Sequence, residues 1–407
     1  MLDQFDLSPL VAPAMDWFYE NKRDLPWRKD RDPYHIWVSE IMLQQTRVEA
    51  VKPYYTGFLT ALPTIADLAA CPKDRLNKLW EGLGYYSRVR NMQRAAGILV
   101  EEYGGRMPED YESILSLPGI GPYTAGAIAS IAFDLPRPAV DGNVLRILAR
   151  VSGDDIDIKS DLAKKRAREA LNAVMPEKGS GIFNQALMEI GATVCLPAGR
   201  PLCGQCPWRG KCLAEREGSW DRLPVRSKGR PRRVEERTVL IVRNGSRVVI
   251  GRRPEDGLLA GLYEFPNVRG HLSEDAALAR TEQMGYEPLH IRRLDEARHI
   301  FSHIEWRMIG YEIRVSDGQL YRGEDDSEAR GDAKENGPEA RGDAKKNGPE
   351  IRGDAEENGS GKGTEKAMTW PVDIEEISRN YAIPSAFAAY ADAVRLERGP
   401  KIAGEKD

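Results

Sequence analysis

The spacing of apolar residues divides the chain into two parts. Through about the first 215 residues, apolar positions recur every three and four residues, the period of an amphipathic helix. The clearest segments are 66–85, 89–103, 125–133 and 163–174, and proline or glycine separates them. The pattern predicts an all-helical first domain, which we place at residues 1–218.

The period changes after residue 236. TVLIVR and RVVIGRR are β-branched runs on either side of Asn244-Gly245-Ser246, a turn sequence typical of a β-hairpin. A second, α+β domain is therefore predicted over residues 236–395, with a flexible tail at 396–407. Between the domains, DRLPVRSKGRPRR has six basic residues and two prolines, which indicates an exposed basic linker over 219–235.

Three copies of an eleven-residue unit interrupt the second domain. EARGDAKENGP, EARGDAKKNGP and EIRGDAEENGS begin at Glu328, Glu339 and Glu350. Two glycines in each copy and the lack of aromatic residues predict a disordered surface insertion over 323–366. This segment has 13 acidic and 8 basic residues, so it accounts for the net charge of −4 of the whole chain. The acidic balance therefore does not exclude a nucleic-acid partner.

The opening residues and the longest apolar stretch both argue against a membrane protein. The opening MLDQFDLSPL is acidic, and the longest apolar stretch, 125–133, is far shorter than the roughly twenty residues of a membrane span. We expect a soluble, cytoplasmic, monomeric protein without a membrane partner.

Four of the five cysteines lie within eighteen residues, at Cys195, Cys203, Cys206 and Cys212. The spacing C-x7-C-x2-C-x5-C brings four thiolates within reach of one centre, and four thiolates suit zinc or an iron–sulfur cluster. No histidine is near, so a structural role is predicted. The remaining Cys71 is expected to be a core thiol.

Two carboxylates are candidates for chemistry. Asp141 stands among apolar residues, where a carboxylate is unfavourable unless it caps a helix or takes part in a reaction. Glu40 shares a predicted helix face with Trp37, Gln44 and Arg47, which favours a cleft over open surface. Between two predicted helices, the Gly-rich turn LPGIGPYT at 117–124 presents backbone N–H groups suited to an anion.

These motifs resemble those of MutY-type adenine DNA glycosylases in the endonuclease III superfamily. The matching segments are PWR (26–28), VSEIMLQQT (38–46), LWEGLGYYSRVRN (79–91), LPGIGPYTAGAI (117–128), VDGNVLRILAR (140–150), FNQALMEIGATVC (183–195) and the cysteine cluster. The resemblance implies a helix-hairpin-helix at about 113–133, two helical subdomains with a cleft between them, and a [4Fe–4S] cluster on the four cysteines (195–212). Seven residues separate the first two cysteines here, one more than is usual in the family.

The resemblance also implies roles for single residues. Glu40 would protonate adenine, and Asp141 would stabilise the positive charge that develops on the sugar, near Tyr123 and Asn143. Tyr123 stands where strand-cleaving relatives have a lysine, which implies a monofunctional enzyme. The adenine pocket would comprise Trp27, Arg28, Leu43 and Gln185, and the DNA contacts Gln44, Tyr85, Gly119 and Gly121.

The second domain resembles a Nudix fold around GLLAGLYEFP (257–266), but HLSEDAALARTEQMGYE lacks the Glu-rich metal-binding pattern of Nudix hydrolases. Phe301, Ser302 and His303 resemble the loop with which the family recognises 8-oxoguanine. The predicted function is removal of adenine from mispairs with 8-oxoguanine or guanine in double-stranded DNA. The alternatives are an endonuclease III-like oxidised-pyrimidine glycosylase/lyase and a non-catalytic DNA-binding protein.

Overall fold

The computed structural model describes residues 2–229, 231–316 and 369–396. These residues form two compact units, and the division falls between Pro231 and Arg232. The predicted insertion at 323–366 lies outside the described residues, as does the predicted tail beyond Leu396. No described helix combines the length and the apolar character needed to cross a membrane.

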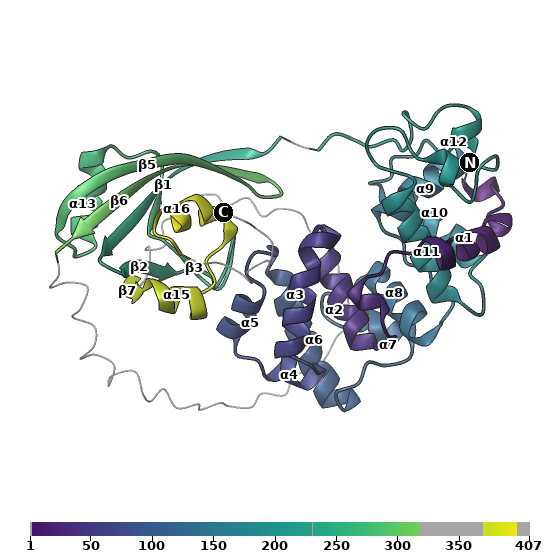
Figure 1. Cartoon of the computed structure of the whole chain (residues 1–407), viewed down its shortest axis with the longest axis horizontal. Coiled ribbons are helices and arrows are strands. Elements are labelled where there is room, and N and C mark those ends of the chain that lie inside the picture. The colour runs from purple at the N-terminus through teal and green to yellow at the C-terminus, as the bar shows by residue number, and fades with distance from the viewer. Residues whose placement is uncertain (1, 230, 317–368, 397–407) are drawn as a thin grey trace, which may run out of the picture. The chain divides into compact units, whose positions relative to one another are not determined.

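The first unit is helical throughout its described length, as the apolar period predicts (Figure 1). Its elements are η1 Leu2–Gln4, α1 Ser8–Asn21, η2 Pro26–Arg28, α2 Pro33–Leu43, α3 Val48–Ala61, α4 Ile65–Ala70, α5 Lys73–Leu79, α6 Ser87–Tyr103, α7 Tyr111–Ser116, α8 Pro122–Phe133, α9 Gly142–Ser152, α10 Asp161–Asn172, α11 Ser180–Thr193, η3 Cys203–Gln205 and α12 Leu213–Arg216.

One predicted helical segment, 66–85, is divided in the structure. It comprises α4 and α5, because Pro72 stands at the start of α5 and cannot continue α4. After α5 the chain turns through Gly82 and Gly84, which have φ angles of 98° and 67°. These left-handed conformations favour glycine, and they lie in the turn between α5, which ends at Leu79, and α6, which begins at Ser87.

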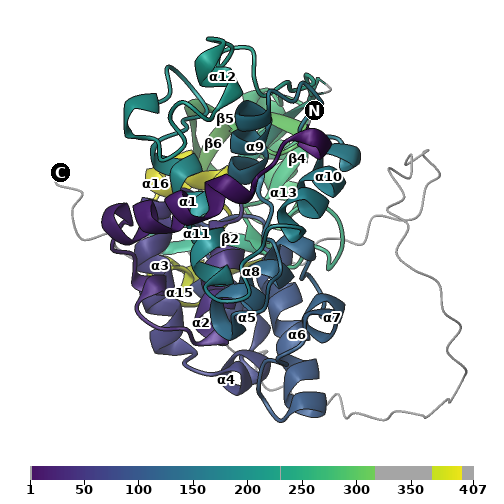
Figure 2. The ribbon, with the colours of Figure 1, turned by 90° about the vertical axis from the view of Figure 1, so that its right-hand side faces the viewer.

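The helices of this unit gather in two groups. Figures 1 and 2 show α2–α7 at one end of the unit and α1 with α9–α12 at the other. The second group shares one apolar core, to which α1, α9, α10 and α11 contribute. Helix α8 packs against α2 and α11. At Gly126 in α8, an added Cβ would lie 2.2 Å from the carbonyl oxygen of Pro138, so the close approach requires glycine.

Part of the expected linker packs on the helical unit. Leu223 is buried, and its carbonyl accepts a hydrogen bond from Arg150 Nε at 2.8 Å. The carbonyl of Val225 accepts a hydrogen bond from the backbone N–H of Ile158 at 3.1 Å. The expectation of an exposed linker over 219–235 is therefore wrong for Ser219 and Leu223, which are buried, whereas Asp221, Arg222 and Val225 are exposed as expected. The last residues of this range belong to β1, which begins at Arg233.

The second unit is built on a mixed seven-stranded sheet with the order β3-β2-β1-β6-β5, in which β4 pairs with β1 and β7 with β2. Strands β1 and β6 are parallel. The predicted hairpin is confirmed, since Asn244 pairs with Arg247 across the turn. The elements are β1 Arg233–Asn244, β2 Arg247–Arg252, β3 Tyr263–Glu264, β4 Asn267–Arg269, α13 Glu274–Gln283, β5 Pro288–Ile300, β6 Ile304–Val315, β7 Thr369–Asp373, α15 Ile374–Asn380, η5 Ser385–Phe387 and α16 Ala388–Ala393.

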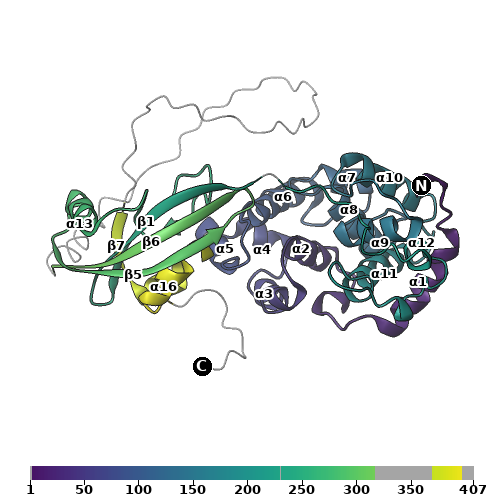
Figure 3. The ribbon, with the colours of Figure 1, turned by 90° about the horizontal axis from the view of Figure 1, so that it is seen from above.

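Each face of this sheet has its own apolar core. On one face, Val239, Ile241 and Trp306 pack against Phe387 and Tyr390 of the C-terminal helices. On the other, a smaller cluster around Leu240, Ile309 and Tyr311 packs against Ala277 of α13. Figure 3 shows α13 and α16 on opposite sides of the strands. The α+β prediction is therefore confirmed for the described part of this unit.

Candidate functional site

A cavity of about 570 Å³ in the helical unit brings the predicted site residues together. Its lining comes from the segment around η2 and from α2, α8, the start of α9, and α11. It includes all the predicted catalytic and adenine-pocket residues and one predicted DNA contact, namely Trp27, Arg28, Glu40, Leu43, Gln44, Tyr123, Asp141, Asn143 and Gln185. Segments as far apart in sequence as Arg23 and Ala192 thus face one space.

The carboxyl group of Glu40 is buried, with 6% of the residue exposed. The hydroxyl of Tyr123 donates a hydrogen bond to its Oε2 at 2.5 Å. Burial raises the pKa of Glu40 to about 7, and the negative charge of Asp141 adds to the rise, whereas Tyr123 and Arg28 oppose it. Glu40 therefore holds a proton in a large fraction of molecules near neutral pH.

Glu40 faces a cavity, as predicted. The predicted helix face that Glu40 would share with Trp37, Gln44 and Arg47 is not present. Helix α2 ends at Leu43, so Gln44 lies in the following turn, where its Nε2 donates to Thr124 Oγ1 at 3.4 Å. Arg47 caps α3 instead, and Trp37 is fully buried in the core. The polar neighbours of Glu40 come from other helices rather than from its own.

Asp141 is both a helix cap and a lining residue of the cavity. Its Oδ1 accepts the backbone N–H of Val144 at 2.7 Å, which begins α9, and its Oδ2 accepts Asn143 Nδ2 at 2.8 Å. Burial raises the pKa of Asp141, and these two hydrogen bonds oppose the rise. Both hydrogen bonds favour the ionised form of Asp141. At Glu40, by contrast, burial favours the protonated form.

The predicted helix-hairpin-helix comprises α7, a turn over 117–121 and α8. Gly119 has a φ of 79°, and an added Cβ would lie 2.6 Å from the Cβ of Asn91, so only glycine fits. Gly121 caps α8, whose second residue is Tyr123. Gly119, Gly121 and Tyr85 do not line the cavity, and Tyr85 is 47% exposed with a φ of 47°.

Two lining residues, Glu189 and Arg23, were not predicted from the sequence. Glu189 in α11 has 1% of its side chain exposed and accepts hydrogen bonds from Arg23 Nε at 2.7 Å and Arg28 Nη2 at 2.8 Å. These contacts hold the pKa of Glu189 at about 2 against the effect of burial. The signal in the sequence was an acidic residue among the apolar residues of Ala186–Ile190.

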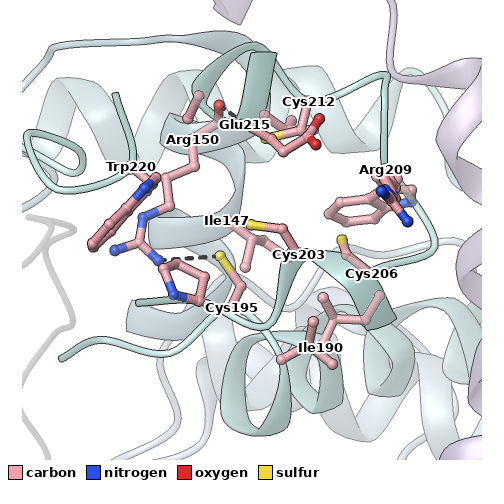
Figure 4. A pocket seen from close by; sticks show the side chains of 15 residues that line it. Ile147, Arg150, Ile190, Cys195, Cys203, Cys206, Arg209, Cys212, Glu215 and Trp220 are labelled. Carbon is pink, nitrogen blue, oxygen red and sulfur yellow. Dashed lines mark hydrogen bonds between the residues drawn. The ribbon is translucent and has the colours of Figure 1, made fainter. Parts of the chain in front are cut away.

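The four clustered cysteines line one apolar cavity next to α9 (Figure 4). Arg150 of α9 donates from Nη1 to Cys195 Sγ at 3.3 Å and to the carbonyl of Leu196 at 2.9 Å. Burial raises the pKa of Cys206 to about 12 and that of Cys212 to about 11. Within the described ranges, no three His, Cys, Asp or Glu side chains are arranged to hold a metal ion. The cysteines nevertheless line one cavity, and thiols are the donor type that iron–sulfur clusters require.

In the second unit, the predicted recognition loop is the turn between β5 and β6. Phe301 is part-buried, and its ring packs edge-on against His299 and Trp306 with centroids 4.6 and 4.9 Å away. The carbonyl of His303 accepts the backbone N–H of Arg233 at 3.0 Å. Ser302 and His303 are exposed at the tip of the turn.

Comparisons with known proteins agree with the two units. The model of the HhH-GPD superfamily of base excision DNA repair proteins matches residues 38–173, and that of the NUDIX domain matches residues 238–333. A solved structure of a thermostable thymine-DNA glycosylase is 29% identical with a TM-score of 0.48, and the alignment covers 51% of this chain and 96% of that one.

Adenine DNA glycosylases are similar over most of the chain. The human protein is 39% identical over 363 residues, which cover 74% of this chain and 66% of the human one. The mouse protein is 38% identical, with 74% and 70% covered, and that of Buchnera aphidicola from Acyrthosiphon pisum is 34% identical, with 66% and 76% covered. The chain thus spans about two thirds of the length of the human relative. With this similarity and this cavity, the chain belongs to the adenine DNA glycosylase family of base excision DNA repair enzymes.

Proposed function

We propose that this protein hydrolyses the N-glycosidic bond of adenine in duplex DNA, opposite 8-oxoguanine or guanine, and leaves the strand uncut. The supporting observation is the pair of carboxyl groups in one cavity, of which Glu40 is buried with a pKa of about 7 and Asp141 is part-buried. An acid near its pKa can donate a proton at neutral pH. A neighbouring carboxylate can stabilise a cation.

The proposed reaction begins with adenine outside the base stack, because neither carboxyl group can reach it within a duplex. Protonated Glu40 donates to N7 of the base, so that adenine leaves as a neutral molecule. The bond electrons go to the base, and positive charge develops on the deoxyribose. Asp141, whose ionised form is favoured by the hydrogen bonds from Val144 and Asn143, stabilises that charge until water adds to the sugar.

Strand cleavage requires an amine that attacks the sugar. No lysine lines the cavity formed by the described residues. Tyr123 occupies the position expected for such a lysine, and its hydroxyl is engaged with Glu40. A phenol cannot form a Schiff base, which supports a monofunctional hydrolase.

The remaining lining residues would bind the base. Glu189 fixes the guanidinium of Arg28, whose Nη1 also donates to the carbonyl of Arg23 at 3.1 Å. Trp27 packs edge-on against Tyr55 at 5.5 Å, which fixes the indole at the cavity wall. With Leu43 and Gln185, these groups give adenine one apolar side and one polar side. Gln44, Tyr85 and the hairpin glycines would contact the DNA around it.

Glu40→Gln removes the acid and keeps the shape of the side chain. We expect adenine release from a duplex with adenine opposite 8-oxoguanine to fall by a factor of about 100 to 10,000, with duplex binding retained. Single-turnover assays with alkali treatment measure the release, and the parent protein should give strand breaks only after alkali. Glu49→Gln, an exposed glutamate of α3, is the matched control. Breaks before alkali, or an active Glu40→Gln variant, would contradict the mechanism.

Tyr123→Phe tests how the pKa of Glu40 is set. The general acid works while protonated, so the rate of the parent should decline about tenfold per pH unit above a pKa of about 7. The hydrogen bond from Tyr123 lowers that pKa, so its removal should move the alkaline limb of the single-turnover profile to higher pH. The acidic limb of the profile, set by Asp141, should keep its position on the pH axis. Tyr19→Phe, at an exposed tyrosine, should leave both limbs unchanged, and an unmoved alkaline limb in Tyr123→Phe would exclude the coupling.

Recognition of the opposing base is proposed for the turn formed by Phe301, Ser302 and His303. Phe301 anchors this turn against Trp306, and the exposed Ser302 can offer a hydroxyl to a base edge. This arrangement would let the second unit examine the partner of adenine.

Ser302→Ala should reduce the preference for 8-oxoguanine over guanine about tenfold, the effect of one hydrogen bond to a base. Binding of duplexes with either base opposite adenine, compared by competition, measures the preference. Ser316→Ala, at the far end of β6, is the control. Equal preference in parent and Ser302→Ala would exclude Ser302 as the discriminating group.

A [4Fe–4S] cluster is proposed for the four cysteines. The support is the donor set, four thiols from one loop around one apolar cavity. When bound, such a cluster would fix the loop next to α9 and take no part in base release.

The purified protein should be brown and contain about four iron atoms per chain by elemental analysis. Cys206→Ala should lose iron and the thiolate–iron absorption, whereas Cys71→Ala, outside the cluster loop, should keep both. A colourless parent protein with one zinc per chain would replace the cluster by a zinc site.

A further inference from the structure

The apolar pattern on one face of the second unit's sheet stops short of the strand ends. Val239 of β1 pairs with Gly310 of β6, and Gly310 pairs with Leu294 of β5. Two residues further along β6, Glu312 pairs with Arg292 of β5. Two residues beyond that, Arg314 lies between Arg243 of β1 and His290 of β5. Charged residues thus replace the core where β1 and β6 end.

A hollow of about 1180 Å³ occupies this place. Besides the strand ends, the β1–β2 turn, the start of α15 and the end of α16 line it. Four arginines contribute to the lining and define what we call the arginine hollow, namely Arg243, Arg292, Arg314 and Arg395.

Glu312 holds two of these arginines in place. It is buried, with 6% of the residue exposed. Its Oε1 accepts Arg243 Nη1 at 3.4 Å, and its Oε2 accepts Arg292 Nε at 2.9 Å and Nη2 at 2.5 Å. One carboxylate shared by two guanidinium groups leaves one positive charge in excess and keeps both groups oriented.

Arg314 and Arg395 add positive charge without a partner among the described residues. Arg314 stands directly opposite Arg243 on the parallel strand, and like charges in such a pair repel. Arg395 has a φ of 58° just after α16, a left-handed position where glycine is favoured. An arginine in this strained conformation at the hollow points to a use for its side chain.

Three acidic residues, Glu312, Asp373 and Glu375, line the hollow together with its four arginines. Asp373 accepts Ser246 Oγ at 2.6 Å and the backbone N–H of Glu375 at 2.9 Å. Glu375 pairs with Arg379 at 3.1 Å. Among the described residues, the excess charge of the hollow is therefore positive.

We propose that the arginine hollow binds a phosphate group. Guanidinium groups match phosphate oxygens with paired N–H donors, and the two arginines on Glu312 are already oriented for this. The phosphate can come from the backbone of DNA or from a free phosphate compound. The site lies at the end of β6 opposite the turn at 301–303, so it is separate from the proposed recognition of the opposing base.

The test uses the full chain and the double variant Arg314→Ala/Arg395→Ala. Arg280→Ala/Arg293→Ala is the matched control, because it removes two exposed arginines whose positions belong to α13 and to the other face of β5. Inorganic phosphate is titrated by calorimetry at constant ionic strength. Binding of an undamaged duplex is measured by fluorescence anisotropy over a range of salt concentrations.

We expect the double variant to lose at least tenfold in affinity for one of the two probes, while the control does not. A duplex salt slope that falls by about 0.9, the effect of one lost phosphate contact, assigns the hollow to the DNA backbone. Loss of inorganic phosphate binding with an unchanged slope assigns it to a free phosphate compound. Equal phosphate affinities and equal slopes in parent, variant and control overturn the proposal.

A charge-retaining variant separates binding from folding. Arg314→Lys/Arg395→Lys should recover most of the affinity that the alanine variant loses, since the positive charges remain. Adenine release by the parent protein tests the proposed function separately, because no residue of the hollow lines the helical unit's cavity. Failure of the proposed function and failure of this proposal are therefore distinguishable.

Discussion

The placement of two carboxyl groups in one cavity, with Glu40 buried and Asp141 part-buried, is the constraint on which the helical unit depends. Glu40 and Asp141 both lose hydration, which favours their neutral forms. Their hydrogen-bond partners then decide which one ionises first. Asp141 receives two N–H donors within its own helix start, whereas Glu40 receives only the hydroxyl of Tyr123 from α8. The pKa of Glu40 therefore depends on the meeting of three helices, because α2 carries Glu40, α8 carries Tyr123 and α9 begins after Asp141.

Helix α9 extends this constraint to the cysteine loop. It begins at the cap formed by Asp141, and one turn later Arg146 donates to Asn143 Oδ1 at 2.8 Å and to the carbonyl of Cys195 at 2.9 Å. A further turn on, Arg150 contacts Cys195 Sγ and the carbonyl of Leu223. A change in the cysteine loop would thus reach the carboxylate of Asp141 through one rigid helix. The proposed cluster would therefore have a physical route to influence the proposed reaction without taking part in it.

The sequence predicted best those features that depend on neighbouring residues. Helical periods, the hairpin at Asn244 and the cap at Asp141 are all local, and the structure has each of them. The ion pairs of Glu189 were beyond reach, because Arg23 lies 166 residues away in the chain. The polar face expected around Glu40 failed for a related reason. The helix ended at Leu43, and partners from distant helices replaced the local ones.

The mixed sheet of the second unit separates the two proposed binding surfaces by its geometry. Parallel pairing sets Arg233 beside Ile304, next to the proposed recognition turn, and sets Arg243 beside Arg314 in the arginine hollow. Ten residues of extended strand between these pairs span about 33 Å. A nucleotide at one end therefore cannot contact the other, whereas a duplex of a dozen base pairs is long enough to span that distance. Both ends remain fixed relative to each other because β1 and β6 are paired over the whole length between them.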